Sequence, residues 1–146
     1  MKTWLVVILI TLLSACSKAP ETGPVEVKWD RDACERCRMV LSDRNFAAEV
    51  RGGERKEIFK FDELGCALHW LEKQTWKNDL KVEIWVKDFQ TQQWLDARKA
   101  FYLPNQTTPM DYGFAATSKS GENTVDFEVA KKAILAKTNR HSHHSH

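Results

Sequence analysis

A thiol and a thioether stand two positions apart in the stretch Cys34-Glu-Arg-Cys37-Arg-Met39. Soft sulfur donors of these two kinds select copper(I) over harder divalent ions, which prefer oxygen and nitrogen. A Cys-x-x-Cys pair alone also serves zinc, disulfide exchange and iron–sulfur clusters, and the nearby Met narrows that choice. A second Met, Met110, lies far downstream between a Pro and an Asp. The pattern predicts a copper(I) site with Cys37, Met39 and Met110 as ligands.

The other thiols near this stretch are harder to assign. Cys34 has three interpretations: a further sulfur donor, a redox partner that forms a disulfide with Cys37, or a surface residue without a role. Cys66 lies beside Leu68 in a predicted helix, so burial in the core is the preferred interpretation. His69 is expected on the polar, solvated face of the same helix.

Composition limits the range of functions. The 146 residues suffice for one ordinary domain, and 42% hydrophobic with 29% charged residues is typical of a globular protein. A formal net charge of +2 without a basic run disfavours nucleic acid as a partner. Catalytic groupings such as a Ser–His–Asp set or an HExxH helix do not stand out, so enzyme chemistry is not predicted.

The amino-terminal residues have the pattern of an export signal. Residues 1–15 combine Lys2 with a short apolar run and end at Leu13-Ser14-Ala15-Cys16, which resembles a bacterial lipobox. The resemblance implies an acylated Cys16 that anchors the protein in a membrane of the cell envelope, facing the periplasm. Ser17 in place of Asp favours the outer membrane. Free thiols in that oxidising compartment must be buried, paired or bound to metal.

The remaining chain is expected to hold a tether, a domain and a tail. Residues 16–24 contain two Pro and one Gly and are expected to form the tether, and the domain should extend over residues 25–137. Residues 138–146 form a His-rich tail that is expected to be flexible and at most a weak chelator of divalent ions.

A repeat within the domain predicts its architecture. Met39 and Met110 are each followed by a short apolar run, a Gly-containing turn, a second run and a helix that opens with Asp, at Asp62 and Asp126. Leu64 begins a stripe of apolar residues at helical spacing, and a similar stripe follows Asp126. We therefore expect an α+β fold of two similar strand–strand–helix–strand halves, about 25–78 and 79–137, packed as one unit. A pseudo-twofold axis would bring the two methionines together.

Several motifs resemble the NosL family, the copper-binding accessory lipoproteins of nitrous oxide reductase. The resemblance covers about residues 30 to 135 and is carried by four stretches: Cys37-Arg38-Met39, Phe61-Asp62-Glu63-Leu64-Gly65-Cys66, Trp94-Leu95-Asp96-Ala97 and Pro109-Met110-Asp111-Tyr112-Gly113. It implies a monomeric copper(I) metallochaperone that delivers copper to the reductase or to its maturation transporter complex, without chemical turnover. The usual motif of the family is Cys-x-x-Cys-Gly-Met, and Arg38 replaces its Gly here.

Two other functions remain as alternatives. A thiol–disulfide oxidoreductase would use Cys34 and Cys37, although such a site normally opens a helix, where the thiol pKa is lowered. A copper-storage or zinc-binding module is the other alternative. Structural zinc requires four closed ligands, which the sequence does not obviously supply.

Overall fold

The computed structural model describes residues 20–137, which adopt the predicted α+β class. The signal segment, Cys16 and the His-rich tail lie outside the described residues. The elements are β1 (Ala48–Gly52), β2 (Glu57–Phe61), α2 (Leu64–Leu71), β3 (Glu83–Lys87), β4 (Trp94–Asp96), β5 (Phe101–Leu103), β6 (Ala115–Thr117) and α3 (Phe127–Ala136). Among residues 20–137, no helix has the length and apolar character needed to cross a membrane.

Four antiparallel strands form the main sheet, in the order β2-β1-β3-β4. Successive side chains of a strand point to opposite faces, so Ala48 and Val50 of β1 share one face with Phe61, which pairs with Ala48. All three are fully buried. This face packs against α2, whose Trp70 ring lies 5.4 Å from the Phe61 ring. β1 is flanked by strands on both sides, and all five of its residues are buried.

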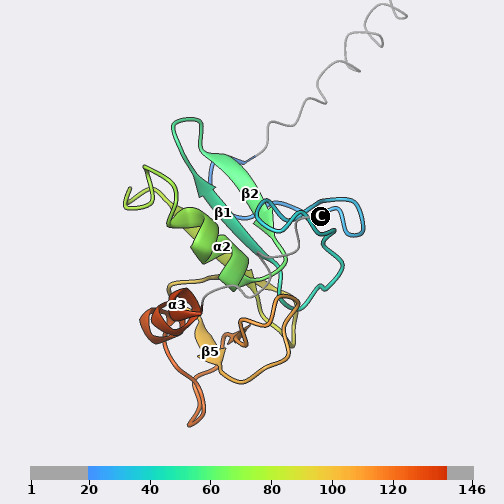
Figure 1. The fold of residues 1–146 in the computed structure, drawn as a ribbon, viewed down its shortest axis with the longest axis vertical. Coiled ribbons are helices and arrows are strands. Elements are labelled where there is room, and N and C mark those ends of the chain that lie inside the picture. Colours follow the sequence, from blue (N-terminus) through green and yellow to red (C-terminus); the bar gives the residue numbers. More distant parts are fainter. Residues whose placement is uncertain (1–19, 138–146) are drawn as a thin grey trace, which may run out of the picture.

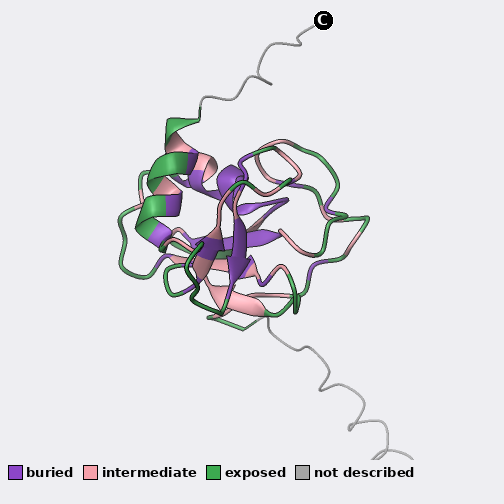
Figure 2. Ribbon diagram, turned by 90° about the horizontal axis from the view of Figure 1, so that it is seen from below, coloured by how far each residue is buried: buried purple, intermediate pink, exposed green. Residues whose placement is uncertain are grey.

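The two helices lie side by side and cover different parts of the sheet structure. α2 packs on β1 and β2, whereas α3 packs on α2 and next to β5 (Figure 1). The predicted apolar stripe of α2 is confirmed, since Leu64, Ala67, Leu68 and Leu71 are all buried. Buried residues concentrate in the strands and on the inner sides of the helices, as Figure 2 shows.

The second half only roughly repeats the first. Residues 25–78 form the expected hairpin of β1 and β2 followed by α2, and the next strand, β3, lies beyond the predicted boundary at residue 78. In the second half β6 and Val125 do not pair with each other, because β5 lies between them: β5 pairs with β6, and Tyr102 of β5 forms a bridge with Val125. The fully buried Tyr102 ring explains this insertion, since its hydroxyl donates to the Ala97 carbonyl at 2.6 Å and anchors β5 in the core.

The outer face of the main sheet is polar and is covered by the segment that precedes the cysteines. The Val25 N–H donates to Glu49 Oε2 at 2.9 Å, and the Arg51 guanidinium donates to the Gly23 carbonyl at 2.9 Å. The Gly23 N–H in turn donates to Glu83 at 2.7 Å. Gly23 therefore already bonds to the domain, slightly before the predicted start at Val25.

Candidate metal centre

A tight turn presents the Cys-x-x-Cys pair. Ala33 and Val40 form an antiparallel bridge, and the Cys34 N–H donates to the Met39 carbonyl at 2.8 Å. Inside the turn the Arg38 N–H donates to the Cys34 carbonyl at 3.0 Å, and Arg38 has a left-handed φ of 65°. Gly adopts this conformation most easily. In this chain Arg38 makes the same turn at a cost in backbone strain.

The turn is fixed to β2, which leads directly into α2. The Glu35 N–H donates to the Lys60 carbonyl at 2.8 Å, and the Lys60 ammonium pairs with Asp32 at 2.6 Å. β2 ends at Phe61, and α2 begins only three residues later. The turn therefore lies beside the first turn of α2, which carries Cys66.

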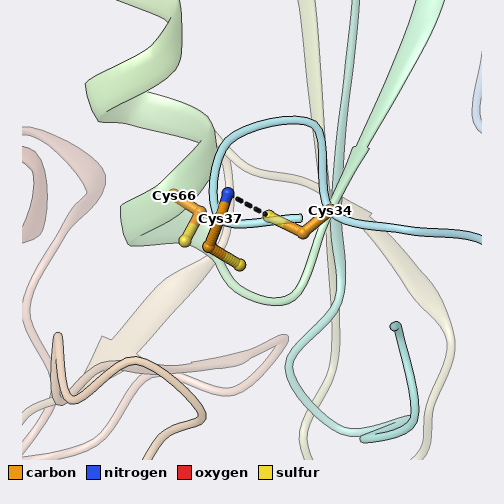
Figure 3. A group of neighbouring side chains, drawn as sticks. All are labelled: Cys34, Cys37 and Cys66. Carbon is orange, nitrogen blue, oxygen red and sulfur yellow. Dashed lines mark hydrogen bonds between the residues drawn. The ribbon is translucent and has the colours of Figure 1, made fainter. Parts of the chain in front are cut away.

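Three sulfur atoms meet at this junction. The Sγ atoms of Cys34, Cys37 and Cys66 all lie within 4.8 Å of one another, and all three thiols are free. Figure 3 shows Cys34 and Cys37 reaching from the turn and Cys66 from α2. Tetrahedral zinc with Zn–S bonds of about 2.3 Å requires S···S separations of about 3.8 Å, so less than about 1 Å of contraction would close the group around a metal. The three thiols therefore form a group that can hold a metal ion.

Burial differs between the three thiols. Cys34 and Cys66 are completely buried, whereas Cys37 is half-buried. The interpretation of Cys34 as a surface residue without a role is therefore wrong. Cys66 is buried as predicted, but its sulfur also belongs to the cluster.

Hydrogen bonds within the cluster give the three thiols different pKa values. The Cys66 thiol donates to Cys34 and, with the N–H groups of Cys37 and Asp62, lowers the pKa of Cys34 to about 4 despite its burial. Burial raises the pKa of Cys37 to about 12, and the Cys34 thiolate adds to the effect. The pKa of Cys66 is also raised, because its proton is held by Cys34. The resting cluster thus carries one thiolate shared among three sulfurs.

Asp62 borders the cluster. The Cys37 thiol donates to Asp62 Oδ2 at 3.3 Å, and Asp62 is only 6% exposed. Burial, together with the nearby Cys34 thiolate, raises the pKa of Asp62 to about 7. The prediction that Asp62 caps the helix is wrong: Glu63 is the N-cap residue of α2, without a side-chain cap, and the Asp62 side chain faces the thiols instead. The corresponding prediction for Asp126 is confirmed, since its Oδ1 accepts from the Val129 N–H at 2.9 Å.

The two predicted methionine ligands have different environments. Met39 directly follows the turn and is 54% exposed, so it lies at the surface next to Cys37. Met110 is partly buried and packs against the core. The thiols are thus assembled into one group, whereas Met39 lies at its outer side and Met110 belongs to a separate stretch of chain.

The Met110 stretch is attached to the same end of α2 as the cluster. Glu63 accepts from the backbone N–H groups of Met110 and Tyr112, the latter at 3.2 Å. The Tyr112 ring covers Gly65 so closely that a Cβ at Gly65 would lie 2.1 Å from Tyr112 Cγ. Both sequence stretches that carry candidate ligands therefore converge on the first turn of α2.

His69 does not lie on a solvated face, contrary to the prediction. Its ring is half-buried, with Nε2 3.1 Å from the Ile134 carbonyl of α3, and its pKa is lowered by burial. The ring also packs 5.2 Å from Tyr112. His69 thus joins α2 to α3 and to the Met110 stretch.

Comparisons with known proteins leave the family open. No family model matches the chain, and no curated protein is significantly similar to it.

Sequence reasoning missed Cys66 and Asp62 as members of the centre. A buried helical Cys beside Leu68 is fully explained by packing, so its own neighbourhood gave no sign of a ligand. The sequence held one signal for a further ligand, and it came from the compartment in which the protein is expected to lie. If the chain is exported as the sequence predicts, three free thiols leave one without a disulfide partner, and a metal is one of the few ways to protect it.

Proposed function

We propose that this protein is a periplasm-facing lipoprotein that carries copper(I) as cargo. Cys34, Cys37 and Cys66 hold the ion, and Met39 is the outer donor on the route by which the ion leaves. By resemblance to the NosL family, the acceptor is nitrous oxide reductase or its maturation transporter complex, and the copper serves assembly of the copper–sulfide site of that enzyme.

The donor set supports the choice of copper(I). Thiolates select soft, monovalent copper over the hard cations, which prefer oxygen. The proposal rests on one observation: the three Sγ atoms lie within 4.8 Å of one another. The lowered pKa of Cys34 favours loading, because metal binding requires deprotonated thiols.

Unequal burial supports a carrier rather than a permanent metal site. Cys34 and Cys66 have no exposed surface, Cys37 is half-buried and Met39 is 54% exposed. An acceptor can therefore approach from the side of Cys37 and Met39 and replace one ligand at a time. A structural zinc site would instead be closed on all sides.

Thiol accessibility argues against the oxidoreductase alternative. An attacking thiol must be both deprotonated and exposed. Here the thiol of low pKa, Cys34, is completely buried, while the more accessible Cys37 has its pKa raised to about 12. Neither thiol combines the two requirements.

Competition titration of the reduced protein against a copper(I) chelator tests the proposal. Cys34→Ser, Cys37→Ser and Cys66→Ser should each weaken copper(I) binding by about tenfold or more, since each removes a thiolate ligand. Ala33→Ser is the matched control, because Ala33 is exposed next to Cys34 and its substitution adds a hydroxyl without removing a sulfur.

Two results would contradict the proposal. One is a wild-type protein that does not compete with the chelator, and the other is a set of Cys variants that bind as tightly as the control. An insulin-reduction assay separates the enzyme alternative, and we expect no turnover in it. A lack of effect of Cys34→Ser alone would favour the interpretation in which Cys34 is a redox partner of Cys37 and not a ligand.

A further inference from the structure

One oxygen atom beside the thiol cluster has no hydrogen-bond partner within residues 20–137. Asp62 Oδ1 is buried without a partner, while Oδ2 of the same carboxyl accepts from the Cys37 thiol at 3.3 Å. Leaving a buried carboxyl oxygen unpaired costs free energy, about 1–3 kcal/mol or more for a charged group. An oxygen in this position is accounted for if it meets a ligand that binds at the cluster.

We propose that Asp62 is the fourth donor of this centre, so that the same site takes a divalent ion of the zinc class through three thiolates and one carboxylate. The inference rests on the proposed function for the location of the site and adds a second class of ion. Copper(I) would use the sulfurs alone, and zinc would use Asp62 in addition.

Zinc and copper(I) differ in how strongly a carboxylate ligand from Asp62 would stabilise their binding. Zinc is four-coordinate and accepts carboxylate oxygen at about 2.0–2.2 Å as readily as thiolate sulfur. Copper(I) prefers soft sulfur, so the carboxylate adds little to its binding. Asp62 therefore tunes the balance between the two ions in the same site.

A neighbouring carboxyl shows the contrast with a structural role. Glu63 is equally buried and its Oε2 also has no partner, but the carboxyl accepts from the N–H groups of Met110 and Tyr112 and so fixes a stretch of chain. Asp62 instead lies at the edge of the cluster: the Cys37 thiol donates to its Oδ2 at 3.3 Å, and a movement of the carboxyl toward the three sulfurs, which form the 4.8 Å group without it, would complete the site. Its position next to the sulfurs is the feature that Glu63 lacks.

The test compares zinc and copper(I) affinities of Asp62→Asn with those of the wild type, each by competition with a chelator of that ion. Removing even an outer partner of a metal ligand costs about 10–100-fold in affinity, so loss of a direct ligand should weaken zinc binding by at least about tenfold. Copper(I) binding should change by less than about threefold. Glu49→Gln is the matched control, because Glu49 is a buried carboxyl on the opposite face of the sheet.

X-ray absorption of zinc-loaded and copper(I)-loaded wild-type protein gives a second measurement that needs no variant. We expect three sulfurs and one oxygen around zinc, and only sulfur around copper(I). Equal losses of both ions in Asp62→Asn would overturn the inference and make Asp62 a positioning residue for Cys37. Unchanged zinc affinity, or zinc without an oxygen neighbour, would also overturn it.

The inference and the proposed function fail separately. If wild-type protein binds zinc through Asp62 but does not bind copper(I), the fourth donor stands and the copper proposal falls. If copper(I) binds tightly and zinc binding is independent of Asp62, the copper proposal stands and the fourth donor falls.

Discussion

Replacing Gly65 by Ala should destabilise the domain, although Gly to Ala inside a helix normally stabilises. A Cβ at this position would lie 2.1 Å from Tyr112 Cγ and Cδ2 and 2.7 Å from Tyr112 Cβ. The contacted atoms are close to the Tyr112 backbone, which is itself held by Glu63 at 3.2 Å and by Lys137 at 2.9 Å. Rotation of the ring cannot relieve the clash, so the Met110 stretch must move away from α2.

The magnitude follows from two opposing contributions. Helix propensity favours Ala over Gly by up to about 1 kcal/mol, whereas overpacking a well-packed contact costs about 1–3 kcal/mol. Because this clash is severe and close to the backbone, we expect the upper part of that range and a net loss of about 1–2 kcal/mol. For a domain of this size the midpoint of thermal unfolding should fall by about 5–10 °C.

Thermal and urea unfolding measured by circular dichroism provide the assay. Gly121→Ala is the control, because its added Cβ would meet only Thr124 at 3.9 Å and should change the free energy of unfolding by less than about 0.5 kcal/mol. A double variant with Tyr112→Ala should show that the two changes are not additive, since the clash disappears with the ring. An unchanged or raised stability of Gly65→Ala would show that Tyr112 does not rest on Gly65.

Four other changes test separate features. Burial raises the pKa of Glu49 to about 7, so the free energy of unfolding should be highest below about pH 4.5 and fall as pH rises to 7 and the buried carboxyl has to ionise. Glu49→Gln should remove this fall, which is about 3 kcal/mol at most, when urea unfolding is compared at pH 5 and pH 8. Arg38→Gly should raise the free energy of unfolding by about 0.5–1 kcal/mol by relieving the left-handed φ of 65°, with no change in copper(I) titration. Met110→Leu keeps the volume of the side chain but removes its sulfur; because the proposed ligands do not include Met110, both the melting temperature and the copper(I) affinity should stay nearly unchanged. A weakened copper(I) affinity would instead support the sequence-based prediction that Met110 is a ligand. Cys16→Ser should release the protein from the membrane fraction or leave it unprocessed, and a mature-sized variant that still sediments with membranes would contradict the lipid anchor.

Local patterns predicted most of the elements. The apolar stripe of α2 and the cap at Asp126 depend on residues three to four positions apart, which helical geometry brings together whatever the rest of the chain does. The pairing in the second half was not predictable in the same way. Insertion of β5 between β6 and Val125 is decided by the buried Tyr102, whose hydroxyl bond to Ala97 is a tertiary contact.

The centre was predictable only where its residues are neighbours in sequence. Cys37 and Cys34 follow from the motif, but Cys66 reaches them through the pairing of the turn with β2 and the start of α2. Asp62 shows how a local signal can mislead, since an Asp just before a helix normally indicates an N-cap. Here the donated bond from Cys37 holds its side chain, and α2 begins with Glu63 as an unassisted N-cap residue.

Tight holding and release of a metal place opposite demands on one site, and the two elements of this centre divide them. Cys66 belongs to a helix packed between the sheet and α3, so it cannot move without disturbing the core. Cys37 lies in a turn that contains a strained Arg38 and continues into the exposed Met39. Opening the turn gives up few buried contacts, whereas moving α2 gives up many. Under the proposed carrier function, ligand exchange should therefore proceed by displacement of Cys37 while Cys66 keeps its position, and the ion would leave past Met39.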